Sequence, residues 1–402
     1  MRLGKEKSAL TRGRAILFIV LLGVTSLFGD MTYEGARSIA GPYLGILGAT
    51  GTVVGVVAGL GELLGYVFRL FSGALSDRIK RYWAITIFGY AVNLFAVPLL
   101  ALAGNWLVAA VLLVVERTGR GIRSPVRDAM LSHASSRTGA GWGFGLHQAL
   151  DQTGAVLGPL AIAGVLYIGA GYRSGFGLLL LPAAAAITML LLARFEFPRP
   201  RDFDLAPPPL ETAGLSPRFR IILLAGAFVA AGYADFPLIA YHFAAAKVMP
   251  AVWVPLLFAL ANAVDGSSGL LLGRLYDRYG IRVMIFSTAL SALAAPLVFL
   301  GAFPAAAVGM GFWGVGMGAQ ESVMRAVVAR LAPPDRRATA FGIFNAVFGV
   351  AWFLGSTLLG VLYDYSVIAV AAASLLLQAC SLPVFLWLAR KERSAISDTR
   401  AP

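Results

Sequence analysis

The sequence predicts an all-α integral membrane protein whose twelve transmembrane helices form two six-helix halves. Three observations support this fold class: an excess of apolar residues, a one-sided distribution of positive charge, and an internal repeat. Of the 402 residues, 58% are hydrophobic and only 13% are charged. Soluble domains carry about a quarter charged residues, so this composition indicates a chain that lies in lipid.

The composition also narrows the possible partners. The formal net charge of +13 would suggest nucleic-acid binding in a soluble chain. In a membrane protein, such charge gathers instead in the loops on one side. The single cysteine, Cys380, allows neither an intramolecular disulfide nor a multi-cysteine metal site. We therefore predict no nucleic-acid partner, no metal and no cofactor.

Hydropathy defines the individual spans, because a membrane-crossing helix needs about 20 mostly apolar residues. The first half offers six such stretches, at residues 15–47, 53–73, 83–103, 106–132, 143–168 and 174–193. The second half offers six more, at residues 221–245, 252–272, 283–301, 304–328, 340–363 and 367–389. The first stretch follows a basic N-terminus without a clear cleavage site, so we expect it to be retained as a span.

The segment between the halves, FEFPRPRDFDLAPPPLETAGLSPRFR, is rich in proline and charge. Such a composition cannot pack a core and is typical of a linker. We predict an N-terminal bundle at residues 1–195, a cytoplasmic linker at 196–217 and a C-terminal bundle at 218–402.

Charge placement tests this topology independently. If both termini are cytoplasmic, only Arg173 and Lys247 of the 33 Lys and Arg residues lie in outer loops. The others lie in cytoplasmic segments or inside spans. This asymmetry follows the positive-inside rule and supports an even number of spans.

The two halves also repeat each other. Three residues after the second span recur 200 positions later, after the eighth: Gly73, Asp77 and Arg78 become Gly273, Asp277 and Arg278. Tyr33 likewise recurs as Tyr233, and Gly121 recurs as Gly318 at a shift of 197. With six spans in each half, the repeats are related by an axis along the membrane normal, which places a cavity between them.

The repeated segments are GALSDRIKRY, residues 73–82, and GRLYDRYGIR, residues 273–282. They resemble the loop signature of the major facilitator superfamily, although Lys80 stands where a glycine is usual. The resemblance extends over all twelve spans, is strongest to a bacterial subgroup, and implies a secondary transporter in the bacterial cytoplasmic membrane. It implies a gating role for Asp77 and Asp277, with a plain turn carrying positive-inside charges as the alternative.

The fourth predicted span carries four arginines at 117, 120, 123 and 127, too many for a surface that faces lipid. Arg117 resembles the superfamily's fourth-helix motif, in which Arg120 replaces the usual glutamine. Helical spacing forms a stripe in which Arg123 or Arg127 pairs with Asp77 as part of a gate. An anion site is the alternative, because arginine suits carboxylate and phosphate.

Acidic residues inside the first span are costly unless they are paired or functional. Asp30, Glu34 and Arg37 lie on one helical face, and a Glu34–Arg37 ion pair is one interpretation. Asp30 has no cation beside it on this helix, so we favour Asp30 as a proton carrier.

Further candidates are spread over other spans. His147 and Asp151 are four residues apart in the fifth span, which suits either a proton relay or a hydrogen-bond network. Asp235 precedes Phe236 and Pro237, where the missing backbone donor loosens the seventh span. Glu62 is a further site candidate. The sequence does not assign the direction in which five other charged or histidine side chains inside spans point: Arg69, His242, Asp265, Glu321 and Arg325.

These residues favour a monomeric secondary transporter that moves a small organic solute across the bilayer by alternating access. We expect efflux by proton antiport, with uptake of an organic anion as the alternative. A membrane receptor or enzyme is the alternative of another class. The sequence shows neither an ATP-binding loop of the G-x-x-x-x-G-K-[ST] type nor a convergent catalytic cluster.

Overall fold

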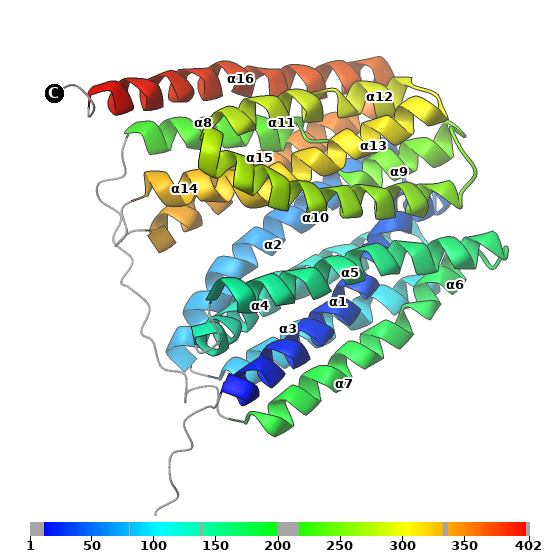
Figure 1. Cartoon of the computed structure of the whole chain (residues 1–402). Coiled ribbons are helices and arrows are strands. Elements are labelled where there is room, and N and C mark those ends of the chain that lie inside the picture. The colour runs from blue at the N-terminus through cyan, green and yellow to red at the C-terminus, as the bar shows by residue number, and fades with distance from the viewer. Residues whose placement is uncertain (1–11, 80, 137–139, 199–216, 333–336, 399–402) are drawn as a thin grey trace, which may run out of the picture.

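The computed structural model describes residues 12–79, 81–136, 140–198, 217–332 and 337–398. Within these ranges the regular secondary structure is helical, without any strand. The helices form two bundles, one from each half of the chain, that lie against each other (Figure 1). The predicted all-α class is confirmed.

The first bundle contains α1 through α7. Their bounds are α1 (Arg12–Ile46), α2 (Gly51–Ile79), α3 (Tyr82–Leu99) with the short continuation η1 (Leu100–Leu102), α4 (Trp106–Ser136), α5 (Ala140–Tyr167), α6 (Gly171–Leu178) and α7 (Leu180–Glu196). α6 and α7 together occupy the sixth predicted span, interrupted at Leu179.

The second bundle contains α8 through α16. Their bounds are α8 (Pro217–Gly232), α9 (Phe236–Ala245), α10 (Trp253–Tyr279), α11 (Arg282–Ala292), α12 (Ala294–Leu300), α13 (Phe303–Gly318), the π-helical turn η3 (Ala319–Met324), α14 (Arg325–Leu331), α15 (Arg337–Tyr365) and α16 (Val367–Asp398). The predicted linker falls mostly on residues 199–216, which lie outside the described residues.

Ten helical segments within the described ranges are long and apolar enough to cross a membrane. They include the pairs α6–α7, α8–α9 and α11–α12, each counted as one segment. Two predicted spans are not among the ten. α4 carries the clustered charges of its Glu116–Arg127 stretch, and α13, with 16 residues, runs into the π-helical turn η3 rather than continuing as a regular helix.

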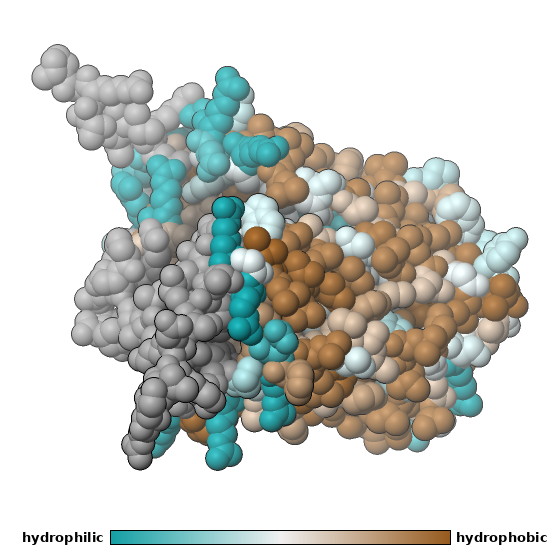
Figure 2. All heavy atoms as spheres, turned by 60° about the horizontal axis from the view of Figure 1, so that its bottom comes forward, coloured by the Kyte–Doolittle hydropathy of each residue, from teal (hydrophilic) through white to brown (hydrophobic). Residues whose placement is uncertain are grey.

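The pair of bundles has two distinguishable ends along the helix axes. The end that holds Arg12, Glu196 and Pro217 is named the linker end, and the opposite end, with the α1–α2 and α9–α10 turns, is named the far end. Figure 2 shows a broad apolar belt and a concentration of hydrophilic side chains at the linker end. Lys247 lies in the far-end turn after α9, whereas Arg173 lies in the first turn of α6 at the same end.

The bundles meet closely at the far end, where glycines of the first half face backbone of the second. A Cβ on Gly41 would collide with the carbonyl oxygen of Pro237, and one on Gly55 would collide with that of Ser356. Asp364 also accepts hydrogen bonds from the backbone N–H groups of Gly51 (2.8 Å) and Thr52 (2.9 Å) at the start of α2. The far end is therefore closed by direct backbone packing.

Towards the linker end the two bundles diverge (Figure 1). Glu321 and Arg325, in the linker-end third of the tenth predicted span, are exposed. Both interact electrostatically with Tyr66 on α2 of the other bundle, so they face the first half rather than the outer surface. At the depth of η3, the protein therefore leaves two charged side chains exposed within electrostatic range of the first half.

Candidate functional site

The charged face of α1 is buried at the centre of the protein. Asp30, Glu34 and Arg37 have exposed fractions of 5%, 7% and 8%. The helical spacing seen in the sequence therefore places all three in the interior, where each needs a partner. The partners come from α1 itself, α4 and the second bundle.

Arg37 joins the two halves. Its Nη2 donates a hydrogen bond of 2.9 Å to Oδ1 of Asp235, and its Nη1 lies 3.8 Å from Glu34. The predicted Glu34–Arg37 pair is thus present, but the shorter contact is the one across the interface. Trp352 of α15 donates its indole N–H to the other oxygen of Asp235 at 3.1 Å.

The position of Asp235 follows from a break in the seventh predicted span. Residues 233–235 are not helical between α8 and α9, and Asp235 has an extended backbone just before Phe236 and Pro237. Proline supplies no N–H, so a helix readily starts there but cannot pass through unbroken. The predicted loosening of this span is observed, and it presents the carboxylate of Asp235 to Arg37.

A second cluster lies within the first bundle around Arg117 of α4. The guanidinium donates to the hydroxyl of Tyr33 and to Glu62 of α2 (2.5 Å), and it lies 3.6 Å from Glu116. Asn93 of α3 donates to Glu116 at 2.5 Å. These contacts fix Arg117 in place, so it is a structural centre of the bundle as well as a site candidate.

A small cavity of about 30 Å³ lies beside this cluster. Tyr33, Arg37 and Arg117 line it, together with Pro237 from the second bundle. Its volume suits one or two water molecules rather than an organic solute. The cavity therefore links the Arg37 and Arg117 clusters.

Asp30 has a cation beside it, contrary to the reasoning that favoured it as a proton carrier. Arg123 of α4 reaches Asp30 at 3.4 Å, and both side chains are buried. The sequence suggested no such neighbour because the two residues are 93 positions apart. Arg123 also lies over the ring of Tyr90, with 4.2 Å to the ring centroid.

The two candidates on α5 do not contact each other through a hydrogen bond among the described residues. His147 is hydrogen-bonded to Ser26 of α1 at 3.0 Å, and Arg127 donates to the same hydroxyl at 2.9 Å. Asp151 has an oxygen that is buried without a hydrogen-bond partner, and it interacts electrostatically with Asp30. His147 therefore belongs to a hydrogen-bond network with Ser26 and Arg127, and this network does not include Asp151.

The loop-signature residues lie at the linker end. The side chain of Asp77 is outside the described residues, so its predicted pairing with Arg123 or Arg127 is not tested. Arg127 contacts Asp128 at 2.8 Å.

The second copy of the signature shows no closed gate in this conformation. Asp277 is exposed and makes no ion pair within the described residues, while Arg278 lies over the ring of Tyr279 at 5.4 Å. Close helix packing does not account for the glycine that begins each copy of the signature. A Cβ on Gly273 would meet open space, and one on Gly73 would meet Pro125 at an ordinary contact distance of 3.8 Å.

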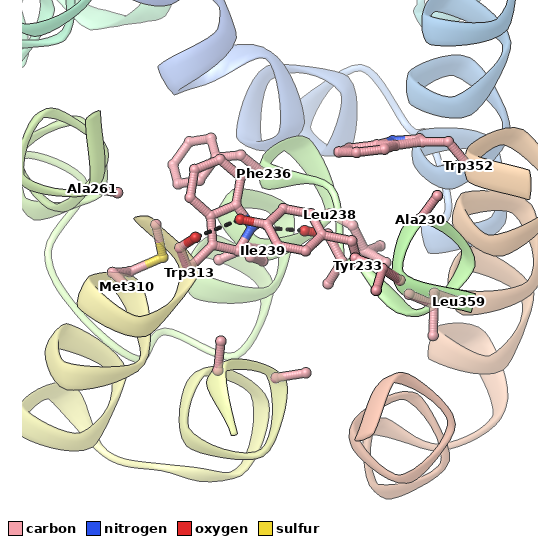
Figure 3. Close-up of a cluster of buried hydrophobic side chains, with 14 of the residues drawn as sticks. Ala230, Tyr233, Phe236, Leu238, Ile239, Ala261, Met310, Trp313, Trp352 and Leu359 are labelled. Atoms are coloured by element: carbon pink, nitrogen blue, oxygen red, sulfur yellow. Dashed lines mark hydrogen bonds between the residues drawn. The ribbon is translucent and has the colours of Figure 1, made fainter. Parts of the chain in front are cut away.

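The repeated tyrosines show how the two halves differ. Tyr33 binds Arg117, whereas its counterpart Tyr233 donates to the backbone oxygen of Trp313 at 2.5 Å. Figure 3 shows Tyr233, Phe236, Trp313 and Trp352 gathered in one buried aromatic cluster. The first half is therefore charged where the second half is aromatic, and the halves face each other with different chemistry.

Some functional candidates were not selected from the sequence. Arg69, Glu321 and Arg325 were recognised as charges inside spans, but their facing could not be read from spacing alone. Tyr33 carried only a repeat signal, and Trp352 carried none. The π-helical turn at Glu321 leaves no signature in the sequence, although such turns often mark functional sites.

Comparison with known proteins identifies the family. The model of the Major Facilitator Superfamily matches residues 16–300 and 234–401. An uncharacterized protein of Mycobacterium tuberculosis is 40% identical over 403 residues, covering 98% of each chain. An uncharacterized MFS-type transporter of Methanocaldococcus jannaschii is 26% identical over 372 residues, covering 87% of this chain and 89% of its own.

A solved structure shows the same fold. The nucleoside transporter NupG superposes with a TM-score of 0.75 at 13% identity, covering 92% of this chain and 100% of its own. At this identity the likeness concerns the fold alone. The chain belongs to the Major Facilitator Superfamily and is a membrane transporter, not an enzyme.

Proposed function

We propose that this protein is a proton-coupled secondary transporter that moves a small organic solute by alternating access. The observation that carries the proposal is the ion pair between Arg37 and Asp235, which joins the two halves on the far-end side of the exposed residues Glu321 and Arg325. A transporter needs one closed side and one open side at a time. The pair closes one side, and the solvent-exposed charges mark the other.

The proposal includes the complete topology. α4 and the α13–η3–α14 segment are spans too, because their charges face protein or solvent between the bundles rather than lipid. With the ten apolar segments they make twelve spans in two bundles, at residues 1–195 and 218–402. The linker end is cytoplasmic under the positive-inside rule, so the conformation described above is open to the cytoplasm. The protein acts as a monomer in the bacterial cytoplasmic membrane.

The coupling of solute movement to protons rests on the ion pair that must break when the far end opens. When the halves separate there, Asp235 moves away from Arg37, and each of the two charges loses its buried partner. A proton taken up by Asp235 from the outside removes one of these charges and favours the outward-open state. Reclosure of the far end restores the ion pair and releases that proton to the cytoplasm, the side that is then open, so a proton enters as the solute leaves. Asp30 and Glu34, also paired with arginines, serve as further acceptors along α1.

Accessibility labelling tests the alternating states. Cys380 is the single cysteine, so Cys380→Ser gives a cysteine-free background. We expect Glu321→Cys in that background to react with a membrane-impermeant maleimide from the cytoplasmic side and not from the outside. Labelling from the outside alone would contradict the assigned orientation. Equal labelling from both sides would contradict a single closed gate.

Solute flux in proteoliposomes tests coupling and direction. Export by antiport, the direction we propose, predicts that solute enters vesicles when the inside is acidic, because protons leave as solute enters. Uptake by symport predicts entry when the outside is acidic. Flux that ignores a pH gradient of either sign would contradict proton coupling.

A further inference from the structure

The arginines inside the membrane fall into two groups. Four of them, Arg37, Arg117, Arg123 and Arg127, each have a carboxylate within 4 Å. The other three are Arg69, Arg120 and Arg325, and none of these side chains has an ion pair or a hydrogen bond within the part of the chain that the structure describes. A bare guanidinium in this setting is costly, so the second group needs an explanation.

The three unpaired arginines lie within electrostatic range of one another, and packing of α2 on α4 brings two of them together. Ser72, three residues after Arg69, donates a hydrogen bond of 3.3 Å to the backbone oxygen of Gly121, which follows Arg120. Arg69 of α2 interacts electrostatically with both Arg120 of α4 and Arg325 of α14, and each interaction is repulsive. Two of these side chains come from the first bundle and one from the second. The cluster therefore spans the interface, and its geometry changes when the halves move.

Aromatic rings hold two of these arginines without neutralising them. Arg120 lies 4.0 Å from the centroid of Tyr33, and Arg69 lies 5.4 Å from that of Tyr66. Stacking on one face orients a guanidinium while its edge keeps its N–H donors. The Nε atom of Arg69 is buried with no hydrogen-bond partner. The donors are thus positioned but unused.

No carboxylate of the described residues lies within 4 Å of these three guanidinium groups, although Asp30, Glu34, Glu62 and Glu116 attract Arg120 from a greater distance. Glu62, which attracts Arg69 and Arg120, is already bound by Arg117 at 2.5 Å. Glu321, four residues before Arg325, is exposed and forms no ion pair within the described residues. The cluster also lies where solvent enters, since Arg325 is exposed and Arg69 and Arg120 are part-exposed.

We propose that Arg69, Arg120 and Arg325 form the binding site for the anionic group of the transported solute, a carboxylate or a phosphate carried by a small organic molecule. Such oxyanions accept parallel N–H bonds from the planar guanidinium edge and would offset the mutual repulsion of three cations. The site takes donors from both halves, so a bound anion draws them together. This inference rests on the transport function proposed above and holds for either direction of transport.

Binding to the purified full-length chain in detergent, at low salt, tests the site without requiring transport. The probes are citrate and benzoate for carboxylates, glucose 6-phosphate and inorganic phosphate for phosphates, glycine for a zwitterion, and choline and glucose as cationic and neutral controls. We expect at least one oxyanion to bind and to raise the unfolding temperature, and choline and glucose to have no effect. The first two probe groups separate carboxylate from phosphate specificity.

Variants locate the binding. We expect Arg69→Gln, Arg120→Gln and Arg325→Gln each to weaken anion binding about tenfold, as loss of a charge-assisted hydrogen bond predicts. Arg120→Lys keeps the charge without the planar edge and should recover only part of the affinity. Arg282→Gln, an exposed position at the linker end of α11, is the matched control and should bind like the unchanged protein.

The outcomes separate this proposal from the transport function. Anion binding that survives all three substitutions, or preferred binding of choline, would overturn the site, as would failure of every oxyanion to bind. Glycine bound more tightly than every simple anion would also contradict an anionic solute. Anion binding that depends on the arginines, combined with no flux in proteoliposomes, would uphold the site and contradict the transport proposal instead.

Discussion

Arg37 on α1 and Asp235 at the break between α8 and α9 form a buried ion pair of 2.9 Å across the interface of the two halves. The carboxylate keeps a second partner, the indole N–H of Trp352. No other ion pair within the described residues joins the two bundles. This relationship is the basis for the first two predictions.

Removal of either charge of this pair should open the far end. Arg37→Gln or Asp235→Asn leaves one buried charge without its partner, which costs about 3–5 kcal/mol in proteins. We expect a cysteine at Ala40, which lines the cavity beside the pair, to become accessible to an impermeant maleimide from the outside. The double variant carries two neutral amides and should be labelled less than either single variant. Equal labelling of all three would argue against the pair as a gate.

Trp352→Phe should weaken the same gate by less. It removes the 3.1 Å hydrogen bond to Asp235 but keeps an aromatic ring against Tyr233 and Phe348. A hydrogen bond to a charged group contributes about 1.5–3 kcal/mol. Thermal unfolding in detergent should show a loss that largely disappears in the Asp235→Asn background. A loss of the same size in that background would mean that Trp352 acts through packing alone.

Gly55→Val should prevent closure of the far end. A Cβ at this position collides with the carbonyl oxygen of Ser356 on α15, and backbone cannot rotate away as a side chain does. We expect the variant to fold, to remain open to the outside and to lose solute flux. Gly164→Ala on α5 is the control, because a Cβ there meets nothing within 4 Å. Unchanged flux in Gly55→Val would show that this contact is not required in the cycle.

The repeated tyrosines should differ in their effects. Tyr33→Phe removes a hydrogen bond to Arg117 inside the charged half and should reduce solute flux strongly, with little loss of stability. Tyr233→Phe removes a hydrogen bond to the Trp313 backbone in the aromatic half and should cost stability with little effect on flux. Such bonds contribute on average about 0.6 kcal/mol in membranes. The opposite pattern in flux and unfolding assays would reverse the roles of the two halves.

Asp30→Asn should reduce pH-driven flux and leave solute exchange partly intact, because exchange needs no proton. The contact with Arg123 adds a complication, since the substitution leaves Arg123 without its carboxylate. We therefore expect Asp30→Asn to unfold at a lower temperature, and Arg123→Gln in the same chain to restore part of that loss without restoring coupling. Driven flux equal to that of the unchanged protein would remove Asp30 from the coupling mechanism.

Much of the fold could be predicted because each span carries its own signal. A run of about 20 apolar residues indicates a helix whatever surrounds it, and the loops carry the positive charge that indicates sidedness. The interruption before Pro237 could also be predicted, since proline acts locally on the backbone. The π-helical turn at residues 319–324 could not, because no proline or other local signal in that segment marks it.

The pairing of charges was decided by the tertiary structure alone. The sequence placed Asp30, Arg37 and Asp235 inside spans, but Arg37 and Asp235 are 198 positions apart and no periodicity relates them. Asp30 looked unpaired on its own helix and became paired only when α4 packed beside α1. The sequence by itself therefore determined a membrane transporter fold in two repeated halves, because length, hydropathy and charge act locally. Only the packing of the halves decided which arginines are neutralised and which stay free, because electrostatic pairing depends on distance in space.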